Sequence, residues 1–298
     1  MITWSWQQEL SADELVEVEE LLTSAASYDE EAGFSTAVPD AAHVGEVRHL
    51  LVTMPPRGSR GSADLDRLPD VRVVAYLRLD LADVVGTVQL VVRPEFRSLG
   101  VATLLFERLD SEAGGWAAVP GLARLAAWSH GEHPAAHRMR MRFGGRVEHA
   151  VFKTLRPVGG NRPFRSAVTE VLTSPATGGA PELVSGHRDA MNPGDAKVLA
   201  RAATEVSVPG SPGHVVAGVD PERPAERLAA LALVRTPDAS RDDLTVLLEQ
   251  ALRMLQDDGA RMVQCHVDAL DDLVVSVSRE LGFVHDQSDL YYVRDLSA

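Results

Sequence analysis

Residues 84–109 read Val-Val-Gly-Thr-Val-Gln-Leu-Val-Val-Arg-Pro-Glu-Phe-Arg-Ser-Leu-Gly-Val-Ala-Thr-Leu-Leu-Phe-Glu-Arg-Leu. The apolar run that ends at Arg93 predicts a strand, and the pattern after Gly100 predicts an amphipathic helix. Gly100 allows a ligand to approach the backbone, and the first turn of a helix presents free N–H groups with partial positive charge. The stretch therefore predicts a loop that binds a pyrophosphate.

This loop differs from the two commonest phosphate-binding loops. It has neither the Gly-Lys-Ser/Thr ending of the P-loop nor the paired glycines of the Rossmann dinucleotide loop. An ordinary strand–turn–helix unit without a ligand is the alternative, because short patterns of this kind also recur by chance.

Composition and charge narrow the class of protein. The chain has 298 residues, enough for two domains, and its net charge of −14 argues against binding to nucleic acid or to an anionic membrane. Cys265 is the single cysteine, so neither an internal disulfide nor a cysteine-based zinc site is expected. There is no signal-peptide pattern and no apolar run near the roughly 20 residues of a spanning helix. We expect a soluble, cytoplasmic protein that is monomeric.

Hydrophobic periodicity predicts a mixed α/β unit in the first half of the chain. Ser11 to Glu14 form a capping-box pattern, which opens a helix to about residue 26. Residues 55–69 are rich in Gly, Ser, Arg and Asp and predict an exposed hairpin loop. The other predicted elements are strands over 49–53, 71–79, 84–92, 124–128 and 147–155, and helices over 102–113 and 134–143.

The second half repeats this order. Shifting the first half by 143 residues places Pro94 on Pro237 and Leu104 on Leu247, which indicates an internal duplication. We therefore expect two α/β domains, 1–157 and 182–298, joined by a Pro/Gly-rich linker over 158–181. Predicted elements are strands over 167–172, 214–218, 227–234, 262–267 and 284–293, and helices over 192–205, 242–255 and 273–279.

The two halves differ at the loop. The same shift places Arg97 on Ser240, Gly100 on Asp243 and Ala102 on Thr245. Acidic residues in the first turn stabilise a helix but repel a pyrophosphate. We therefore expect only the first half to bind one, and the second half to be a degenerate copy kept for packing.

Arg97-Ser-Leu-Gly-Val-Ala102 after a strand and a proline resembles the acetyl-CoA loop of the GCN5-related N-acetyltransferases (GNATs). A second signature begins Trp128-Ser-His-Gly and continues through Pro134-Ala-Ala to Leu155-Arg-Pro157. With the duplication, these motifs resemble the mycothiol synthase family, whose members are tandem GNAT proteins. The resemblance is close over residues 84–157 and faint over 181–298, where Leu281-Gly-Phe283 and Asp289-Leu-Tyr-Tyr292 are the clearest remnants.

This resemblance implies two tandem GNAT domains and the use of acetyl-CoA. The acceptor it implies is a primary amine of a small molecule, namely the cysteinyl amine of a glucosaminyl-inositol precursor. A splayed strand pair would leave backbone groups of the first-half strand free for the pantetheine amides. The residues that it assigns to the cofactor are Leu90, Val91, Val92, Arg97, Ser98, Leu99, Gly100, Val101, Ala102 and Thr103.

The chain departs from the family at two positions. The family's strand glutamate corresponds to Gln89 in the first half and Ala229 in the second, and neither side chain accepts a proton near neutral pH. The family's tyrosine corresponds to Arg140 and Ser278. Three hypotheses follow: an acetyltransferase with its active centre in the first half, a catalytically silent acyl-CoA-binding protein, and a structural module that has lost CoA.

His130 is the candidate general base, because histidine titrates near neutral pH and the Trp128 segment ends a strand beside the expected thioester. A hydrogen-bonded or exposed turn histidine is the alternative. His133 and His137 follow it, but Pro134 interrupts the spacing, so we expect no metal.

Residues Asp29, Glu30 and Glu31 follow the predicted first helix and are candidates to bind the acceptor amine; a solvated charge run is the alternative. Cys265 is expected to be buried and inert.

Overall fold

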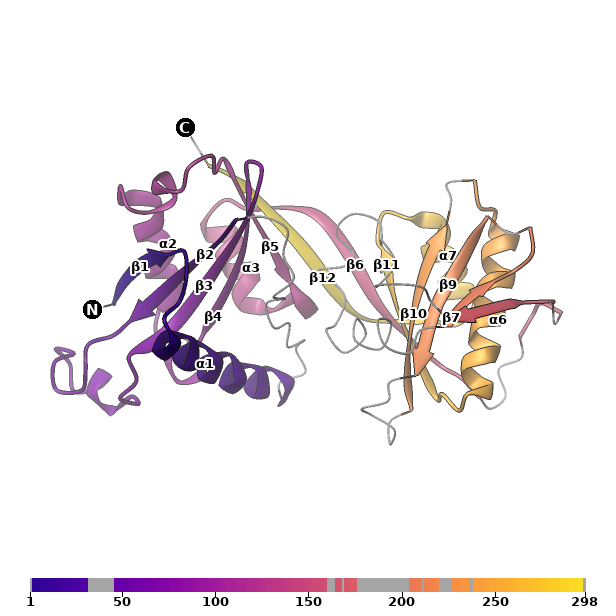
Figure 1. Cartoon of the computed structure of the whole chain (residues 1–298), viewed down its shortest axis with the longest axis horizontal. Coiled ribbons are helices and arrows are strands. Elements are labelled where there is room, and N and C mark those ends of the chain that lie inside the picture. The colour runs from indigo at the N-terminus through magenta and orange to yellow at the C-terminus, as the bar shows by residue number, and fades with distance from the viewer. Residues whose placement is uncertain are drawn as a thin grey trace. The chain divides into compact units, whose positions relative to one another are not determined.

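The computed structural model describes residues 2–31, 46–159, 164–167, 169–175, 204–210, 212–219, 227–235 and 238–296 (Figure 1). The chain forms two compact units, and each is a mixed α/β unit as expected. Unit 1 comprises Met1–Ser129, His133–Glu148 and Tyr291–Ala298, and unit 2 comprises His130–Glu132 and His149–Leu290. No helix among the described residues is both long and apolar enough to span a bilayer.

Unit 1 contains a sheet in the order β1-β2-β3-β4-β5-β12. Its neighbours from β1 to β4 pair antiparallel, and β4 pairs with β5 in parallel. The parallel pair needs a crossover, and α2 is the helix in that crossover. The elements are β1 (Thr3–Gln7), α1 (Ala12–Glu31), β2 (Glu46–Thr53), β3 (Val73–Ala82), β4 (Val85–Val92), α2 (Val101–Ser111), β5 (Arg124–Ser129), α3 (Pro134–Arg142) and the end of β12 (Val284–Asp295).

Helix α1 begins at the predicted capping box. The Glu14 carboxylate accepts the Ser11 backbone N–H at 3.1 Å, and the Ser11 hydroxyl accepts the Glu14 N–H at 3.4 Å. The helix continues to Glu31, so the prediction that it ends near residue 26 is wrong. Asp29, Glu30 and Glu31 consequently lie in its last turn instead of following it.

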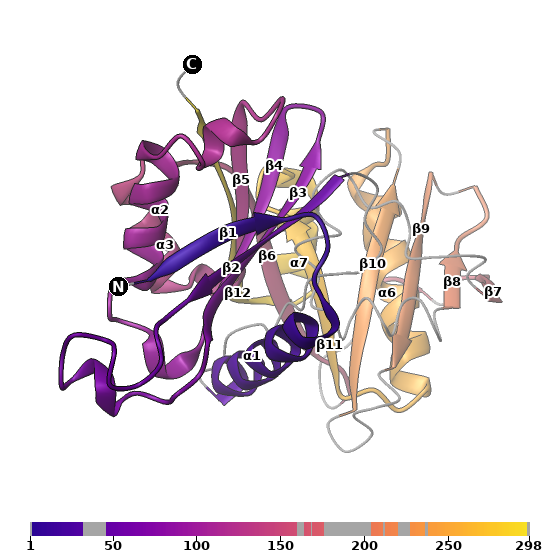
Figure 2. The same ribbon diagram turned by 60° about the vertical axis from the view of Figure 1, so that its left-hand side comes forward.

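The two faces of the unit 1 sheet pack against different helices. Val18 and Leu21 of α1 pack with Leu51 and Tyr76 on one face (Figure 2). The opposite face forms a larger core with α2, in which Leu105 and Leu109 are fully buried. From Ala75 onward the odd positions of β3 face the core with α2, while Tyr76 between them faces α1, as the two-residue period of a strand requires.

The composition of residues 55–69 predicts an exposed loop, but one side chain of this loop, that of Arg60, is buried in the structure. The Arg60 side chain is buried and donates hydrogen bonds to the backbone carbonyls of four surrounding residues. These carbonyls belong to Pro55 (2.9 Å), Leu65 (3.0 Å), Leu68 (3.2 Å) and Pro69 (3.0 Å), and the Asp70 carboxylate accepts a further bond at 3.1 Å. One guanidinium thus provides hydrogen-bond donors to four backbone carbonyls of this loop.

Unit 2 contains strands in the order β6-β11-β10-β9-β8-β7. Strands β10 and β11 pair in parallel, as β4 and β5 do, and α6 lies between them in the chain as α2 does. This correspondence agrees with an internal duplication. The elements are β6 (Arg146–Pro157), β7 (Leu172–Pro175), β8 (Thr204–Ser207), β9 (Gly213–Val219), β10 (Leu228–Arg235), α6 (Arg241–Asp257), β11 (Met262–Asp268), α7 (Asp272–Glu280) and the start of β12.

Two predictions in this half need correction. The strand predicted over residues 167–172 forms instead as β7, from Leu172 to Pro175. Residues 204–205, predicted as the end of a helix, begin strand β8, while the rest of that predicted helix lies outside the described residues. Pairing of Thr204 and Glu205 with β9 accounts for the strand, because their backbone groups are satisfied across the sheet.

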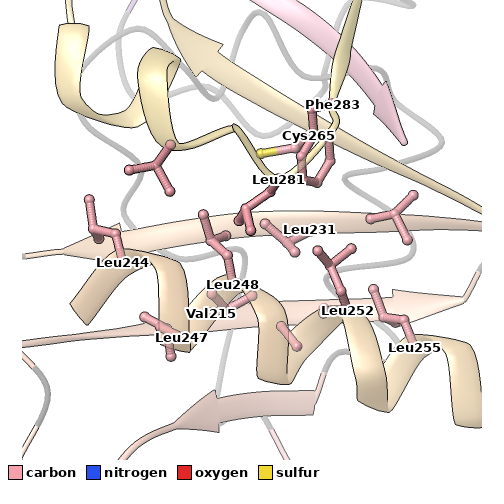
Figure 3. Packing of buried hydrophobic residues seen from close by; sticks show 14 of the residues in the cluster. Val215, Leu231, Leu244, Leu247, Leu248, Leu252, Leu255, Cys265, Leu281 and Phe283 are labelled. Carbon is pink, nitrogen blue, oxygen red and sulfur yellow. The ribbon is translucent and has the colours of Figure 1, made fainter. Parts of the chain in front are cut away.

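The core of unit 2 is built on α6. Figure 3 shows the leucines of α6 packed with Val215 of β9 and Leu231 of β10. Phe283 lies beside Cys265 in the same cluster. Cys265 lies in this apolar cluster and is buried, as expected. The fully buried leucines of α6 are Leu244, Leu247, Leu248, Leu252 and Leu255.

Two long strands contribute residues to both units. In β6, residues 146–148 are counted with unit 1 and residues 149–157 with unit 2. In β12, residues 284–290 are counted with unit 2 and residues 291–295 with unit 1. The two units are therefore not successive stretches of chain.

Replacing Arg60 with Ala is expected to lower the free energy of unfolding of unit 1 by at least about 2 kcal/mol, because four partly buried backbone carbonyls lose a hydrogen-bond donor. All four tryptophans lie in unit 1, so tryptophan fluorescence during urea unfolding reports this unit. Arg67→Ala is the matched control from the same loop, since the Arg67 side chain is 82% exposed. Equal stability of the two variants would contradict the role given to Arg60.

Candidate functional site

The turn between β4 and α2 has the backbone geometry of an anion-binding loop. Phe96 is fully buried and anchors it, while Ser98 and Gly100 have φ angles of 61° and 81°. A Cβ atom on Gly100 would meet nothing within 4 Å, so glycine is needed here for its φ angle and leaves the space in front of the backbone open. Leu99, between the two, is 51% exposed.

The N-terminus of α2 is open to a ligand. No described side chain caps it, and its first turn contains no acidic residue. The first intrahelical bond runs from the Leu104 N–H to the Gly100 carbonyl at 2.9 Å. The N–H groups of Val101, Ala102 and Thr103 therefore point out of the helix end without intrahelical partners.

Strands β4 and β5 separate beside this turn. Their parallel pairing joins residues 85–87 to residues 124–126 and ends at Thr87. The rest of β4 stays paired to β3 through Val92. Backbone groups alternate sides along a strand, so part of the N–H and C=O groups of Leu90, Val91 and Val92 face the side that β5 has left. The splay that the resemblance implies is thus present in unit 1.

Arg97 is held by two elements of unit 1. Its Nε donates to the Val92 carbonyl at 3.0 Å, and its two terminal nitrogens donate to the Asp29 carboxylate at 2.5 and 3.1 Å. Its guanidinium also lies 5.1 Å from the centre of the Tyr28 ring. These contacts connect the end of α1 to the start of the loop and offset much of the charge of Arg97.

In the predicted acidic site at the end of α1, the Asp29 carboxylate is therefore already bound by Arg97. A cationic acceptor would compete with a bidentate guanidinium for Asp29. Glu30 and Glu31 belong to the same last turn, but their side chains lie outside the described residues. The assignment of these three residues to the acceptor remains a prediction.

The structure assigns His130 and His133 to different units. His130 belongs to unit 2, where its Nδ1 lies 3.2 Å from the Asp289 carboxylate, which also accepts the Gly131 N–H at 2.8 Å. His133 belongs to unit 1 and caps α3, its Nδ1 accepting the Ala135 N–H at 3.1 Å. Burial lowers the pKa of His133. No group of three or more His, Cys, Asp or Glu side chains in the described part of the chain is arranged to hold a metal ion.

Sequence reasoning missed Asp289 as the neighbour of His130 and missed a buried polar cluster in unit 1. In that cluster, the His49 Nδ1 and the Tyr76 hydroxyl lie 2.6 Å apart, and Arg78 donates to Asp80 at 2.8 Å. Arg78 and Asp80 are both buried. The alternation of Tyr76, Arg78 and Asp80 along β3 was the available signal, but alternation alone predicts a solvated face as readily.

The corresponding helix end in unit 2 is closed. Ser240 accepts the Asp243 N–H at 3.2 Å, and the Asp243 carboxylate accepts the Ser240 N–H at 3.0 Å. This capping box occupies the helix N-terminus and places negative charge on it. Ala229 and Ser278, the second-half counterparts of the family's glutamate and tyrosine, are buried in unit 2.

Comparison with known proteins finds relatives in the family that the motifs resemble. No family model matches the chain. It is 35% identical to the mycothiol acetyltransferase of Saccharomonospora viridis over 150 residues, which are 48% of this chain and 42% of that protein. It is 30% identical to that of Frankia casuarinae over 183 residues, 55% of this chain and 52% of the relative. These alignments span about half of the relatives' own lengths. A longer alignment, with the mycothiol acetyltransferase of Paenarthrobacter aurescens, has 28% identity and covers 70% of this chain and 69% of the relative.

Solved structures show the fold. The tandem GNAT protein from the clavulanic acid biosynthesis pathway matches with a TM-score of 0.61 at 16% identity, covering 100% of this chain and 99% of that one. A GCN5-related N-acetyltransferase from Sphaerobacter thermophilus matches with a TM-score of 0.56 at 16% identity, covering 99% and 96%. The chain thus has a tandem GCN5-related N-acetyltransferase fold and resembles the mycothiol acetyltransferases in sequence.

Proposed function

We propose that this protein is an acetyl-CoA-dependent N-acetyltransferase that binds acetyl-CoA in unit 1. The observation that carries the proposal is the difference between the two helix ends. The N-terminus of α2 has no side-chain cap, whereas Ser240 and Asp243 close that of α6. A pyrophosphate gains hydrogen bonds and favourable charge at the first helix end and meets a carboxylate at the second.

Each part of the unit 1 site has a task in acetyl transfer. The N–H groups of Val101, Ala102 and Thr103 would bind the pyrophosphate of CoA. The backbone groups of residues 90–92 that face away from β3 would bind the pantetheine amides and position the thioester. Holding the thioester and an amine in attack geometry supplies much of the rate of such a reaction, and a backbone N–H can stabilise the oxyanion that forms.

The acceptor that we propose is a primary amine of a small molecule. The cysteinyl amine of a glucosaminyl-inositol precursor is the first one to test, because the relatives that share up to 35% identity are named mycothiol acetyltransferases. The net charge of −14 also favours a cationic acceptor over an anionic one.

A second function is a catalytically silent protein that binds acyl-CoA. Gln89 and Ala229 replace the family's glutamate, and Arg140 and Ser278 replace its tyrosine. In unit 1 the Arg140 guanidinium lies 5.6 Å from the centre of the Tyr292 ring. Neither an amide nor an arginine can take a proton at neutral pH, which favours this alternative unless other residues do so.

One assay separates the two functions. The chain is mixed with acetyl-CoA and a panel of amines that includes cysteamine, glucosamine and the cysteinyl glucosaminyl-inositol, and CoA and product are separated by chromatography. Thiol dyes are avoided, because some acceptors carry a thiol of their own. An acetyltransferase yields acetylated amine and CoA in equal amounts above an acceptor-free control. A silent protein binds acetyl-CoA but yields no product.

The two helix ends predict one acetyl-CoA per chain. Calorimetric titration is expected to give a stoichiometry near one, because α2 lacks a side-chain cap at its N-terminus whereas the corresponding helix α6 has one. Two sites of comparable affinity would contradict the assignment to unit 1.

Gly100→Asp is expected to cost at least about 2 kcal/mol of acetyl-CoA affinity, because it places strain and negative charge at the pyrophosphate. Gly58→Asp is the matched control, since Gly58 also has a positive φ angle, of 84°, and open space around it, but lies in the loop before β3. Titration of both folded variants should show a loss for Gly100→Asp alone. Unchanged affinity would mean that acetyl-CoA binds elsewhere.

A further inference from the structure

We propose that Gln89, Tyr76 and His49 form the acceptor end of the unit 1 site. In this arrangement the Gln89 carbonyl oxygen holds the attacking amine, and the Tyr76 hydroxyl passes the amine proton to His49. This inference rests on the acetyltransferase function proposed above. It assigns a proton route to a unit that has no carboxylate at the position of the family's glutamate.

Sheet register places the three side chains on one face. His49 of β2 pairs with Arg78 of β3, and Arg78 pairs with Gln89 of β4. Tyr76 precedes Arg78 by two residues, so it lies on the same face and diagonally opposite both His49 and Gln89. Diagonal neighbours in a sheet are within reach of aromatic and long side chains.

The side-chain oxygen of Gln89 is available to accept a hydrogen bond from an amine. Its Oε1 is buried and accepts no hydrogen bond from the described residues. A buried carbonyl without a donor is costly, so such an atom indicates a position that a ligand or water fills. Gln89 immediately precedes Leu90, Val91 and Val92, which we assign to the pantetheine. An amine that donates to Oε1 would therefore lie next to the thioester.

Tyr76 and His49 have the protonation states that a relay needs. Burial raises the pKa of Tyr76 to about 12, so its hydroxyl keeps its proton. Burial, assisted by the Arg78 guanidinium, lowers the pKa of His49, and the Asp80 carboxylate opposes this only in part. The imidazole is therefore neutral at pH 7. With the hydrogen of the ring on Nε2, Nδ1 is free to accept the Tyr76 hydroxyl 2.6 Å away.

The step is balanced without another reactant. The amine nitrogen attacks the thioester carbon, the C–N bond forms, and the C–S bond breaks with its electron pair leaving on the CoA sulfur. The nitrogen of the tetrahedral intermediate gives a proton to the Tyr76 oxygen as the hydroxyl proton moves to His49 Nδ1. His49 is half-buried, so the imidazolium then returns its proton to water, from which the thiolate takes one.

Kinetics of three variants test the relay with acetyl-CoA and the best amine of the panel above. Tyr76→Phe should lower kcat about 100-fold or more and leave the KM for acetyl-CoA unchanged. His49→Gln should act in the same way, with His214→Gln on β9 of unit 2 as its control. Gln89→Ala should raise the KM for the amine more than it lowers kcat. Each variant must first match the wild type in thermal unfolding and in calorimetric acetyl-CoA affinity.

Two kinetic results would overturn the relay. One is a kcat for folded Tyr76→Phe within twofold of wild type. The other is loss of turnover in His130→Ala with full turnover in Tyr76→Phe. That result would mean that His130, the base predicted from the sequence, accepts the amine proton. A wild-type chain that binds acetyl-CoA but acetylates no amine would refute the proposed function itself.

A measurement on the wild-type chain covers the case in which these variants do not fold. Selective ¹⁵N-histidine labelling reports the tautomer of each ring, and sequential backbone assignment of the wild-type chain identifies the signal of His49. The relay requires hydrogen on Nε2 and a hydrogen-bonded, unprotonated Nδ1 at pH 7. Hydrogen on Nδ1 would overturn it, because Tyr76 could not then donate to that atom.

Discussion

The open N-terminus of α2 is the feature on which the functional account depends. A helix always begins with N–H groups that have no partner inside the helix, and a sequence must supply partners or leave the groups to water or a ligand. In unit 2 the Ser240 and Asp243 side chains cap α6, whereas the corresponding helix of unit 1, α2, has no side-chain cap. The same fold therefore produces one helix end that favours an anion and one that repels it.

The surroundings of this helix end in unit 1 are built to keep it in place. Buried Phe96 anchors the turn, and Arg97 ties it both to the end of β4 and to Asp29 on α1. The carboxylate that sequence reasoning gives to the acceptor thus also holds the loop. The polar cluster around Tyr76 lies on the α1 side of the sheet, beside the same strand that would bind the pantetheine.

Local signals in the sequence predicted what depends on local physics. The capping box at Ser11, the strand–turn–helix around Gly100 and the acidic first turn of α6 each follow from residues a few positions apart. Contacts between residues far apart in the chain leave no local pattern in the sequence that would predict them. The pair between Asp29 and Arg97, the neighbours His130 and Asp289, and the burial of Arg60 depend on how the chain folds back on itself. The alternation of Tyr76, Arg78 and Asp80 along β3 is equally typical of a solvated strand face, and only their burial shows a polar cluster.

Hydrogen exchange with and without acetyl-CoA tests the central claim most directly, because it reports on both helix ends in one experiment. The account predicts that ligand slows exchange of the backbone amides of residues 98–103, and of those at residues 90–92 that face the gap beside β4. Amides in the first turn of α6 should exchange at the same rate with and without ligand. Protection at the start of α6 without protection at the start of α2 would contradict the account.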